Sequence, residues 1–325
     1  MKFYMKNMLL ASTIILGATF ASAETTLKLA HAAPESDLQQ SMSLFFKEQV
    51  ESRTDGNVIV NLFPSGQLGN DAQMIDGIRS GIIDIAMVGL NNYSGLMPES
   101  AAFTLPFMFP TRESAYQVLD GSVGQGVLDQ MGEFGLRGLG FPENGYRNMT
   151  NNRGPIKVPA DVKGLQMRVN NSIALNNMFA ALGANPQQIP VAELYTALET
   201  GVVDAQDHPI GVTLSFKFYE VQDYLSMTQH AYSPLALAMN NGTFEGLSAD
   251  EQAIVLGVSA EAVAMQRELS IAKEDDMIAA LEADGMTVNR DVDGAAFQEA
   301  VKPVWEAFIK ANGDKLVNAI LEASK

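Results

Sequence analysis

The sequence predicts an α/β protein with two lobes built on open mixed or parallel sheets. The chain has 325 residues, of which 47% are hydrophobic, so it is long enough for two domains with ample cores. Strand and helix patterns alternate from residue 25 onward, which is typical of an α/β sheet. Residues 74–86 and 193–205 also resemble each other, since both read as helix, glycine, two β-branched residues, aspartate and strand. Two similarly built lobes explain this likeness, and a chance similarity of two βαβ units is the alternative.

The first 23 residues read as an export signal. Lys2 and Lys6 precede an apolar run of about 13 residues, which is too short to span a bilayer. Small residues at 21–23 then offer a signal-peptidase site. We therefore predict a cleaved signal peptide over 1–23 and a periplasmic mature chain that starts at Glu24. An N-terminal membrane anchor is the alternative.

The early part of the mature chain alternates strands with helices. The expected strands are 25–33, 57–64 and 82–90, and the expected helices are 36–56 and 71–81. Gly56 is expected to stop the first helix, and Asp71 is a plausible N-cap of the second. Apart from Asp84, residues 82–90 are continuously apolar, which is typical of a strand covered on both faces.

The last third of the chain is predicted to be mostly helical. Ser248 and Glu251 form an S-x-x-E capping box at the start of an amphipathic run that reaches about Ala283 without a proline. A helix of this length exceeds what one small lobe needs, so we expect it to cross between the lobes. Pro303 is expected to kink or break a further helix over 295–313.

The charge and composition of the chain limit its partners. Its formal charge is −17, so nucleic acids and anionic membrane surfaces are not expected partners. A small anion is still possible as a ligand, because screening lets a local cation override the global field. The sequence has no cysteine, so an exported protein must rely on its core instead of disulfides.

The sequence carries no signature of the common enzyme classes. Its three histidines, His31, His208 and His230, lie in no H-E-x-x-H pattern, and no G-x-S-x-G, Walker A or G-x-G-x-x-G motif occurs. A partial calcium loop at 291–299 lacks a third ligand before its glycine. We therefore expect no catalytic residues, no metal and no cofactor.

Two arginines stand where strands meet loops, the usual ligand edge of an open α/β sheet. Arg147 lies in "ENGYRNMTNN", and Arg168 lies in "KGLQMRVNN", where alternation places Gln166 and Asn170 on its strand face. A guanidinium binds a carboxylate through two parallel hydrogen bonds, so either arginine is a candidate anion ligand. A surface charge or a structural ion pair is the alternative for each.

The sequence resembles the periplasmic solute-binding subunits of TRAP transporters, the DctP family. The resemblance runs from about Leu27 to at least residue 245 and more loosely to the end, and it is carried by "FPSGQLGND", "LPFMFPTRESAYQVLDG", "ENGYRNMTNNRGPI", "DVKGLQMRV", "LGANPQQIPVAELYTALETGVVDAQDHP" and "FYEVQDYLSMTQHAYSPLA". It implies a two-lobed periplasmic binding protein fold with hinge strands and a long lobe-spanning helix. It also implies the lobe boundaries, 24–144 plus 234–273 for lobe I and 145–233 plus 274–325 for lobe II.

The resemblance implies a ligand site in the cleft between the lobes. The clamp arginine of the family matches Arg168, and the supporting arginine of its E-N-G-x-R segment matches Arg147. The polar residues after the clamp strand match Asn170 and Asn171, and a pocket wall matches Val191.

This chain differs from the family in one motif. The family's D-G-Q-E-N-P reads "DAQDHP" in this chain, which includes Gln206 and replaces the ligand-facing asparagine with His208. With Val191, this histidine suggests a pocket unlike that of the sialic-acid-binding members. An imidazole can donate from both nitrogens when charged, so we expect ligand affinity to vary between about pH 5.5 and 8.

The expected cleft edge of the first lobe follows its strands. Asn91, Asn92 and Tyr93 come after the strand at 82–90, and His31 and Glu35 come after the first strand. Of these, Asn91, Tyr93 and Glu35 are the predicted ligand residues, and a structural role is the alternative for His31.

These inferences together predict an extracytoplasmic TRAP subunit that is not an enzyme. It would capture a C4-dicarboxylate, a sugar acid or a hydroxy or keto acid on an arginine clamp. As a monomer, it would deliver the anion to the small and large membrane subunits of the permease. The alternatives are a sulfonate ligand, service to a sensor or an ATP-driven importer, and an exported two-lobed enzyme.

Overall fold

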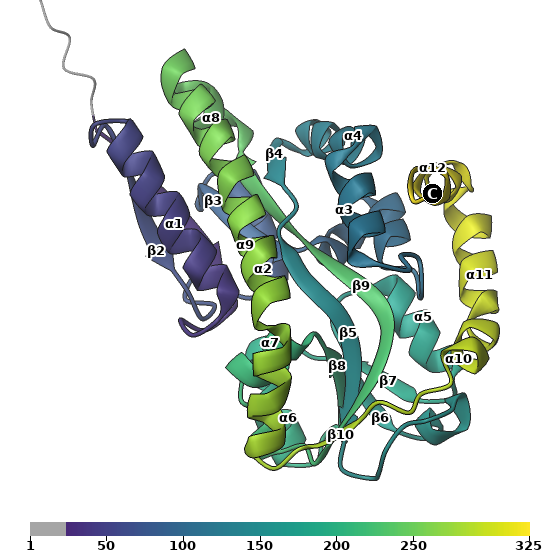
Figure 1. Cartoon of the computed structure of the whole chain (residues 1–325). Coiled ribbons are helices and arrows are strands. Elements are labelled where there is room, and N and C mark those ends of the chain that lie inside the picture. Colours follow the sequence, from purple (N-terminus) through teal and green to yellow (C-terminus); the bar gives the residue numbers. More distant parts are fainter. Residues whose placement is uncertain (1–23) are drawn as a thin grey trace, which may run out of the picture.

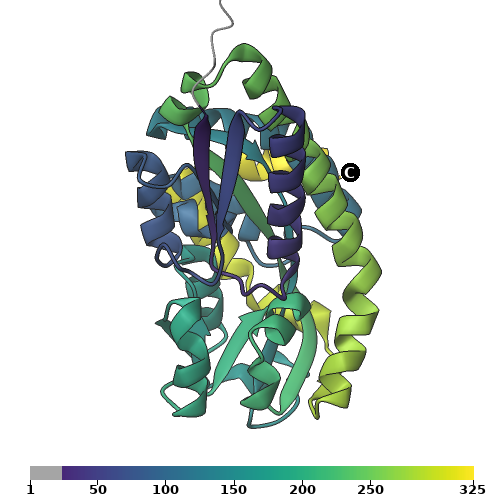
Figure 2. The same ribbon diagram turned by 90° about the vertical axis from the view of Figure 1, so that its left-hand side faces the viewer.

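The computed structural model describes residues 24–325 as an α/β protein with two halves, one above the other in Figures 1 and 2. The strand order is β2-β1-β3-β9-β5-β8-β6-β7, and β4 and β10 also pair with β9. The predicted signal peptide lies outside the described residues. Across residues 24–325, we find no helix with the length and apolar character that a membrane span requires.

The elements alternate as an α/β chain requires. Up to the first crossing between the halves they are β1 (Thr25–His31), α1 (Leu38–Arg53), β2 (Val58–Phe63), α2 (Asp71–Ser80), β3 (Ile85–Gly89), the 3₁₀ turns η1 (Leu90–Gly95) and η2 (Pro98–Thr104), α3 (Arg112–Asp120), α4 (Ser122–Gln130), η3 (Met131–Phe134), β4 (Leu136–Gly140) and β5 (Glu143–Asn151). They continue with η4 (Pro159–Val162), β6 (Gln166–Val169), α5 (Ile173–Ala181), β7 (Asn185–Gln188), α6 (Val191–Glu199), β8 (Ala205–His208), α7 (Ile210–Ser215), η5 (Phe218–Glu220), β9 (Tyr224–Asn240), α8 (Asn241–Gly246), α9 (Ala249–Ala283), β10 (Thr287–Asn289), α10 (Gly294–Ala300), α11 (Lys302–Asn312) and α12 (Lys315–Ala323).

The two halves share one connectivity, which confirms the predicted internal repeat. In the first half β1, β2 and β3 pair in parallel in the order β2-β1-β3, and in the second β6, β7 and β8 pair as β7-β6-β8. The repeated helices, α2 and α6, are each followed by a left-handed glycine, Gly81 with φ 76° and Gly201 with φ 73°. Asp84 and Asp204 then each accept a hydrogen bond of 2.8 Å from a backbone N–H of the neighbouring strand.

Strands β5 and β9 connect the two halves. Part of β9 pairs with β3 and β4, and the rest pairs with β5 and β10. Between Arg147 and Met149 the pairing of β5 with β9 is irregular, and there Gln229 has φ 42° and donates its N–H to Asn148 Oδ1 at 3.1 Å. A bulge of this kind redirects side chains, and here it accompanies the fully buried ring of His230.

Helix α9 runs along both halves, as its sequence predicts (Figure 1). It has 35 residues and begins with the expected capping box between Ser248 and Glu251. One part of it packs on α1, and another contacts α7 and β10. It is therefore a rigid element that both halves touch.

Two predicted helix features have different outcomes. The break near Pro303 is confirmed, since α10 ends at Ala300 and Pro303 occupies the first turn of α11. The N-cap of α2 is Asn70, so the prediction of Asp71 was wrong. Asn70 Oδ1 accepts from the Gln73 N–H at 3.0 Å, and Gln73 Oε1 accepts from the Asn70 N–H at 2.9 Å. This reciprocal pair needs a spacing of three residues, which Asp71 does not have.

The C-terminal helices contact both halves. Helix α11 packs on α5, and α12 packs on α3 and α4. Trp305 Nε1 on α11 donates to the Pro106 carbonyl oxygen at 3.0 Å. The predicted boundaries assign all of 274–325 to lobe II, whereas α12 touches helices assigned to lobe I, and the boundaries themselves stay a prediction.

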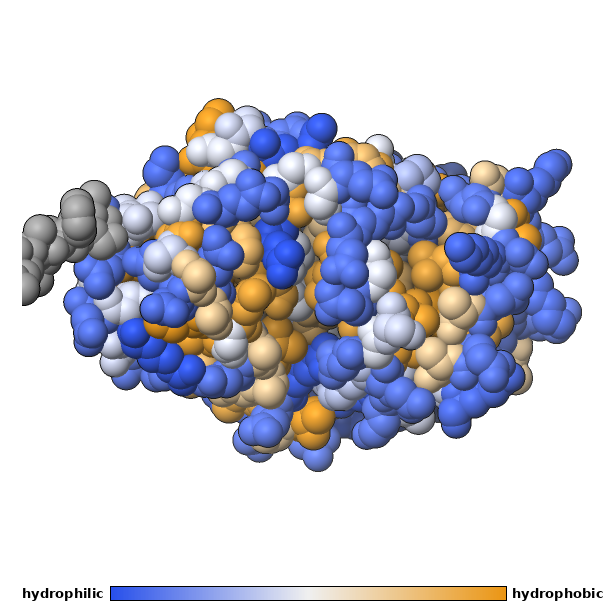
Figure 3. All heavy atoms as spheres, turned by 90° about the horizontal axis from the view of Figure 1, so that it is seen from above, coloured by the Kyte–Doolittle hydropathy of each residue, from blue (hydrophilic) through white to orange (hydrophobic). Residues whose placement is uncertain are grey.

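Polar residues cover much of the face shown in Figure 3, with hydrophobic areas between them. Within 24–325, large hydrophobic side chains more than half exposed include Leu44, Ile82, Ile173 and Val202. They belong to different helices and loops, and single exposed hydrophobic residues are ordinary on folded proteins.

Candidate functional site

A cleft lies where the carboxyl ends of the parallel strands of the two halves meet. It contains about 490 Å³ of empty space, counting the part open to solvent. Open α/β sheets bind ligands at this edge because the strands end there in loops and helix N-termini. The polar lining includes Gln39, Asp71, Asn91 and Asn92 from the first half, and Arg147, Arg168, Asn170 and His208 from the second.

Arg168 is a buried arginine without an internal counter-ion. Its side chain is 1% exposed, Nε donates to the Ile189 carbonyl oxygen at 2.8 Å, and Nη1 donates to His208 Nε2 at 3.0 Å. In the part of the chain that the structure describes, no Asp or Glu oxygen lies within 4.0 Å of its nitrogens. Burial and then the nearby charge of Arg147 lower the pKa of Arg168 to about 10, while the more distant charges of Asp207 and Asp71 oppose this shift. The side chain is still charged at neutral pH.

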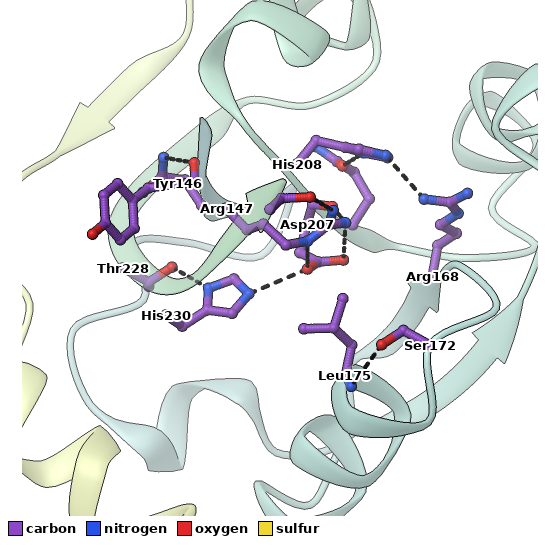
Figure 4. Close-up of polar contacts among 12 residues, drawn as sticks. Tyr146, Arg147, Arg168, Ser172, Leu175, Asp207, His208, Thr228 and His230 are labelled. Carbon is purple, nitrogen blue, oxygen red and sulfur yellow. Dashed lines mark hydrogen bonds and ion pairs between the residues drawn. The ribbon is translucent and has the colours of Figure 1, made fainter. Parts of the chain in front are cut away.

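Arg147, in contrast, is paired with a carboxylate inside the protein. Its Nε lies 2.5 Å from Asp207 Oδ2 and its Nη2 lies 3.1 Å from Asp207 Oδ1 (Figure 4). His230 Nε2 also reaches Asp207 Oδ2 at 3.2 Å, and its Nδ1 lies 2.8 Å from Thr228 Oγ1. Burial alone would raise the pKa of Asp207, but the charge of Arg147 and the hydrogen bonds from His230 and Arg147 hold that pKa well below its usual range. The Arg147 charge is therefore compensated before any ligand binds.

His208 lies at the end of β8, against Arg168 (Figure 4). An arginine only donates, so His208 Nε2 accepts, and the ring proton is on Nδ1, which bonds Gln206 Oε1. Burial, followed by the charges of Arg168 and Arg147, lowers the pKa of His208 well below 6.5. This lowered pKa argues against the predicted variation of ligand affinity with His208 between about pH 5.5 and 8, because that variation requires the charged ring.

The first half contributes amides from the turn after β3. A Cβ at Gly89 would lie 2.7 Å from Asn91 Oδ1, so a larger residue at this position would displace the Asn91 amide. Asn91 Nδ2 and Asn170 Oδ1 are buried atoms that have no hydrogen-bond partner among residues 24–325. Buried polar atoms are rarely left without a partner, so this donor and this acceptor are available to a polar ligand.

The structure brings six of the ten predicted ligand residues to the cleft. They are Asn91, Arg147, Arg168, Asn170, Val191 and His208. Asn171 lines the adjoining opening, which also includes Asn92 and Arg168. The other three predicted residues do not line the cleft: Gln206 and Tyr93 are fully buried, and Glu35 is exposed on the loop after β1.

Several lining residues were not predicted from the sequence, including Gln39, Asp71, Asn144 and Phe216. One of them had a signal in the internal repeat. Asp71 is the first residue of α2, and the predicted residue Val191 is the first residue of the equivalent helix α6. Applying the repeat to the site would therefore have found Asp71.

Characterised relatives cover nearly the whole chain. The 2,3-diketo-L-gulonate-binding periplasmic protein of Escherichia coli K12 is 39% identical over 308 residues, which are 94% of each chain. A TRAP periplasmic solute-binding protein from Polaromonas, solved with D-erythronate, has a TM-score of 0.89 at 34% identity and covers 92% of this chain and 98% of its own. A sugar acid binding protein from Advenella mimigardefordensis, solved with galactonate, has a TM-score of 0.90 at 33% identity and covers 93% and 98%.

The family match supports the same conclusion. The DctP family, described as bacterial extracellular solute-binding protein family 7, matches residues 29–312. The structural neighbours are two-lobed TRAP binding proteins, which confirms the predicted fold. Because the family and these neighbours are binding proteins, the prediction that the chain is not an enzyme is also confirmed. The chain belongs to the DctP family of bacterial extracellular solute-binding proteins.

Proposed function

We propose that this protein captures a small carboxylate in the cleft, binds the carboxylate group on Arg168 and delivers the solute to a TRAP permease. The observation that carries this proposal is that buried Arg168 forms no direct ion pair with a carboxylate of residues 24–325. An unpaired buried charge costs several kcal/mol, and an anionic ligand removes that cost by pairing with it. The planar guanidinium favours a carboxylate because it can form two parallel hydrogen bonds.

The rest of the lining favours a hydroxylated monocarboxylate over a dicarboxylate. The amides of Gln39, Asn91 and Asn170 can bind hydroxyl groups, which donate and accept hydrogen bonds. They can also bind keto oxygens, which only accept. Asp71 adds a carboxylate to the lining, and burial raises its pKa while the charge of Arg168 opposes that rise. A second ligand carboxylate would have to share this part of the cleft with Asp71, which costs free energy when both groups are charged. The sugar acids bound by the Polaromonas and Advenella relatives are of the favoured class.

We further infer the cellular setting from the family and the N-terminal sequence. A signal peptide over 1–23 would direct the protein to the periplasm, where the Escherichia coli relative is named as a periplasmic protein. There it would act as a monomer that meets the small and large membrane subunits of the permease.

A thermal-shift screen of the purified mature protein tests the ligand class. We expect galactonate, D-erythronate or 2,3-diketo-L-gulonate to raise the melting temperature, and succinate to raise it less. A ligand at a hundred times its dissociation constant adds about 2.7 kcal/mol to the free energy of unfolding. Galactitol, which lacks the carboxylate, is the control and should have no effect. Equal shifts with galactitol, or no shift with any of the anions, would refute the proposal.

A contact between the two halves, beside the cleft, is expected to slow ligand release. Ser215 Oγ on α7 donates to Asp37 Oδ2 at 2.7 Å, and Asp37 also caps α1 in the other half by accepting from the Gln39 N–H. Two residues close to this pair in the sequence line the cleft: Gln39, two residues after Asp37, and Phe216, directly after Ser215. A closed state with more contacts is favoured by a bound ligand.

Ser215→Ala is therefore expected to raise the dissociation rate of galactonate about fivefold, the equivalent of one hydrogen bond. Stopped-flow fluorescence would measure it. Ser80→Ala is the matched control, because Ser80 ends α2 and its hydroxyl bonds only the Gly77 carbonyl oxygen of the same helix. A dissociation rate equal to that of the wild type would show that the contact does not stabilise the closed state.

A further inference from the structure

The hydrogen bonds behind His208 form a directed chain that starts at Arg168. Arg168 Nη1 donates to His208 Nε2 at 3.0 Å, and His208 Nδ1 donates to Gln206 Oε1. Gln206 Nε2 donates to Thr150 Oγ1 at 2.8 Å, and Thr150 Oγ1 donates to Gln222 Oε1 at 2.8 Å. Gln222 Nε2 ends the chain on a backbone carbonyl oxygen at 3.0 Å. We call His208, Gln206, Thr150 and Gln222 the relay.

The groups that flank the relay, Arg168 and a backbone carbonyl oxygen, fix the direction of its hydrogen bonds. A guanidinium can only donate and a carbonyl oxygen can only accept, so every group between them must accept from one side and donate to the other. This requirement assigns the amide orientation of both glutamines and the tautomer of the histidine. No relay residue is more than 5% exposed, so solvent does not supply substitute partners.

The relay presents a neutral acceptor to Arg168. The other histidine tautomer would place an N–H against the N–H of Arg168, and a protonated ring would place two positive charges 3.0 Å apart. Asp207 shows the contrasting arrangement, because as a carboxylate it both holds Arg147 and compensates its charge. A neutral histidine holds its arginine without compensating it.

We propose that Gln206, Thr150 and Gln222 are positioning residues of the anion site, which act through His208 to hold Arg168 in place with its charge available to the ligand. This inference rests on the proposed function, in which Arg168 is the anion ligand. It also explains why a fully buried polar chain extends from the cleft through the β5–β8 pair, where Thr150 lies opposite Gln206.

The tautomer of His208 can be measured without any ligand. Long-range ¹H–¹⁵N spectra of the unliganded protein report the protonation of both ring nitrogens in each of its three histidines, and His208→Asn assigns the signal. The charged groups that act on His208 are Arg168 on β6, Arg147 on β5 and Asp207 on β8. The wild type is expected to show a proton on Nδ1 alone from about pH 5.5 to 8.

Removing one relay hydroxyl should disturb both the tautomer and the binding. In Thr150→Val, Gln206 Nε2 loses its acceptor, so we expect a mixture of His208 tautomers and an affinity for galactonate that is about five- to tenfold lower by calorimetry. Thr150→Ser keeps the hydroxyl and should behave as the wild type. Thr104→Val is the matched control, because it removes an equally buried hydroxyl that bonds only the Ala101 carbonyl oxygen.

Gln222→Met breaks the relay at a second point and serves if Thr150→Val does not fold. The proposal is overturned if both variants keep the wild-type histidine spectrum, or if the wild type carries its proton on Nε2. A changed spectrum with unchanged galactonate affinity would also overturn it, because His208 would then not act on Arg168. If galactonate does not bind the wild type, the proposed ligand is wrong, and the spectra of the unliganded variants still test the relay.

Discussion

Replacing Arg168 with Met is expected to lower the affinity for galactonate at least about a hundredfold while leaving the melting temperature of the unliganded protein nearly unchanged. Each charge-assisted hydrogen bond to a carboxylate contributes about 1.5–3 kcal/mol, and the planar fork offers two. The fold is spared because removing an unpaired buried charge offsets the loss of the hydrogen bonds to Ile189 and His208.

Two further variants make this experiment specific. Arg168→Lys keeps the charge but has no planar fork, so we expect an affinity between those of the wild type and Arg168→Met. Arg290→Met removes an arginine whose side chain is 58% exposed and pairs with Glu282, so it should change neither affinity nor melting. Calorimetry that finds wild-type affinity in Arg168→Met would refute the anion clamp.

Features of the fold that depend on neighbouring residues were predictable from the sequence. The capping box of Ser248 and Glu251, the break near Pro303 and the internal repeat all lie within short segments. The N-cap of α2 was harder, because Asn70 and Asp71 are both good caps and only the reach of Gln73 decides between them. The contact of α12 with α3 and α4 has no local signal, since it joins segments about 200 residues apart.

The candidate site was also only partly predictable from the sequence. Strand alternation and the family motif pointed to Arg168, which the structure places in the cleft. The two arginines looked alike in sequence, because the partner of Arg147, Asp207, lies 60 residues away on another strand. The state of His208 was also hidden, since the charges that lower its pKa come from β5 and β6. Tertiary contacts, rather than residue types, separate the anion ligand from the structural arginine.

Replacing Arg147, unlike replacing Arg168, is therefore expected to destabilise the fold. Arg147→Met leaves Asp207 buried without its main partner, and breaking a buried pair on one side costs about 3–5 kcal/mol. We expect the melting temperature of the unliganded protein to fall by roughly 10 °C in differential scanning calorimetry. The double variant Arg147→Met, Asp207→Asn removes both charges and should recover much of that loss, because neither partner then remains charged and unpaired.

The loss of stability in Arg147→Met is expected to depend on pH in a defined direction. In the wild type the pKa of Asp207 is held well below its usual range, so the stability from this carboxylate is complete above about pH 4 and is lost only as the pH falls toward the folded pKa. In Arg147→Met, burial raises the pKa of Asp207 instead, and His230 lies within reach to share a proton. The folded variant therefore takes up a proton that the folded wild type does not, and its deficit in unfolding free energy should shrink between about pH 7 and 5. A deficit that stays constant over this range, or a variant as stable as the wild type, would show that Asp207 does not depend on Arg147 for its charge.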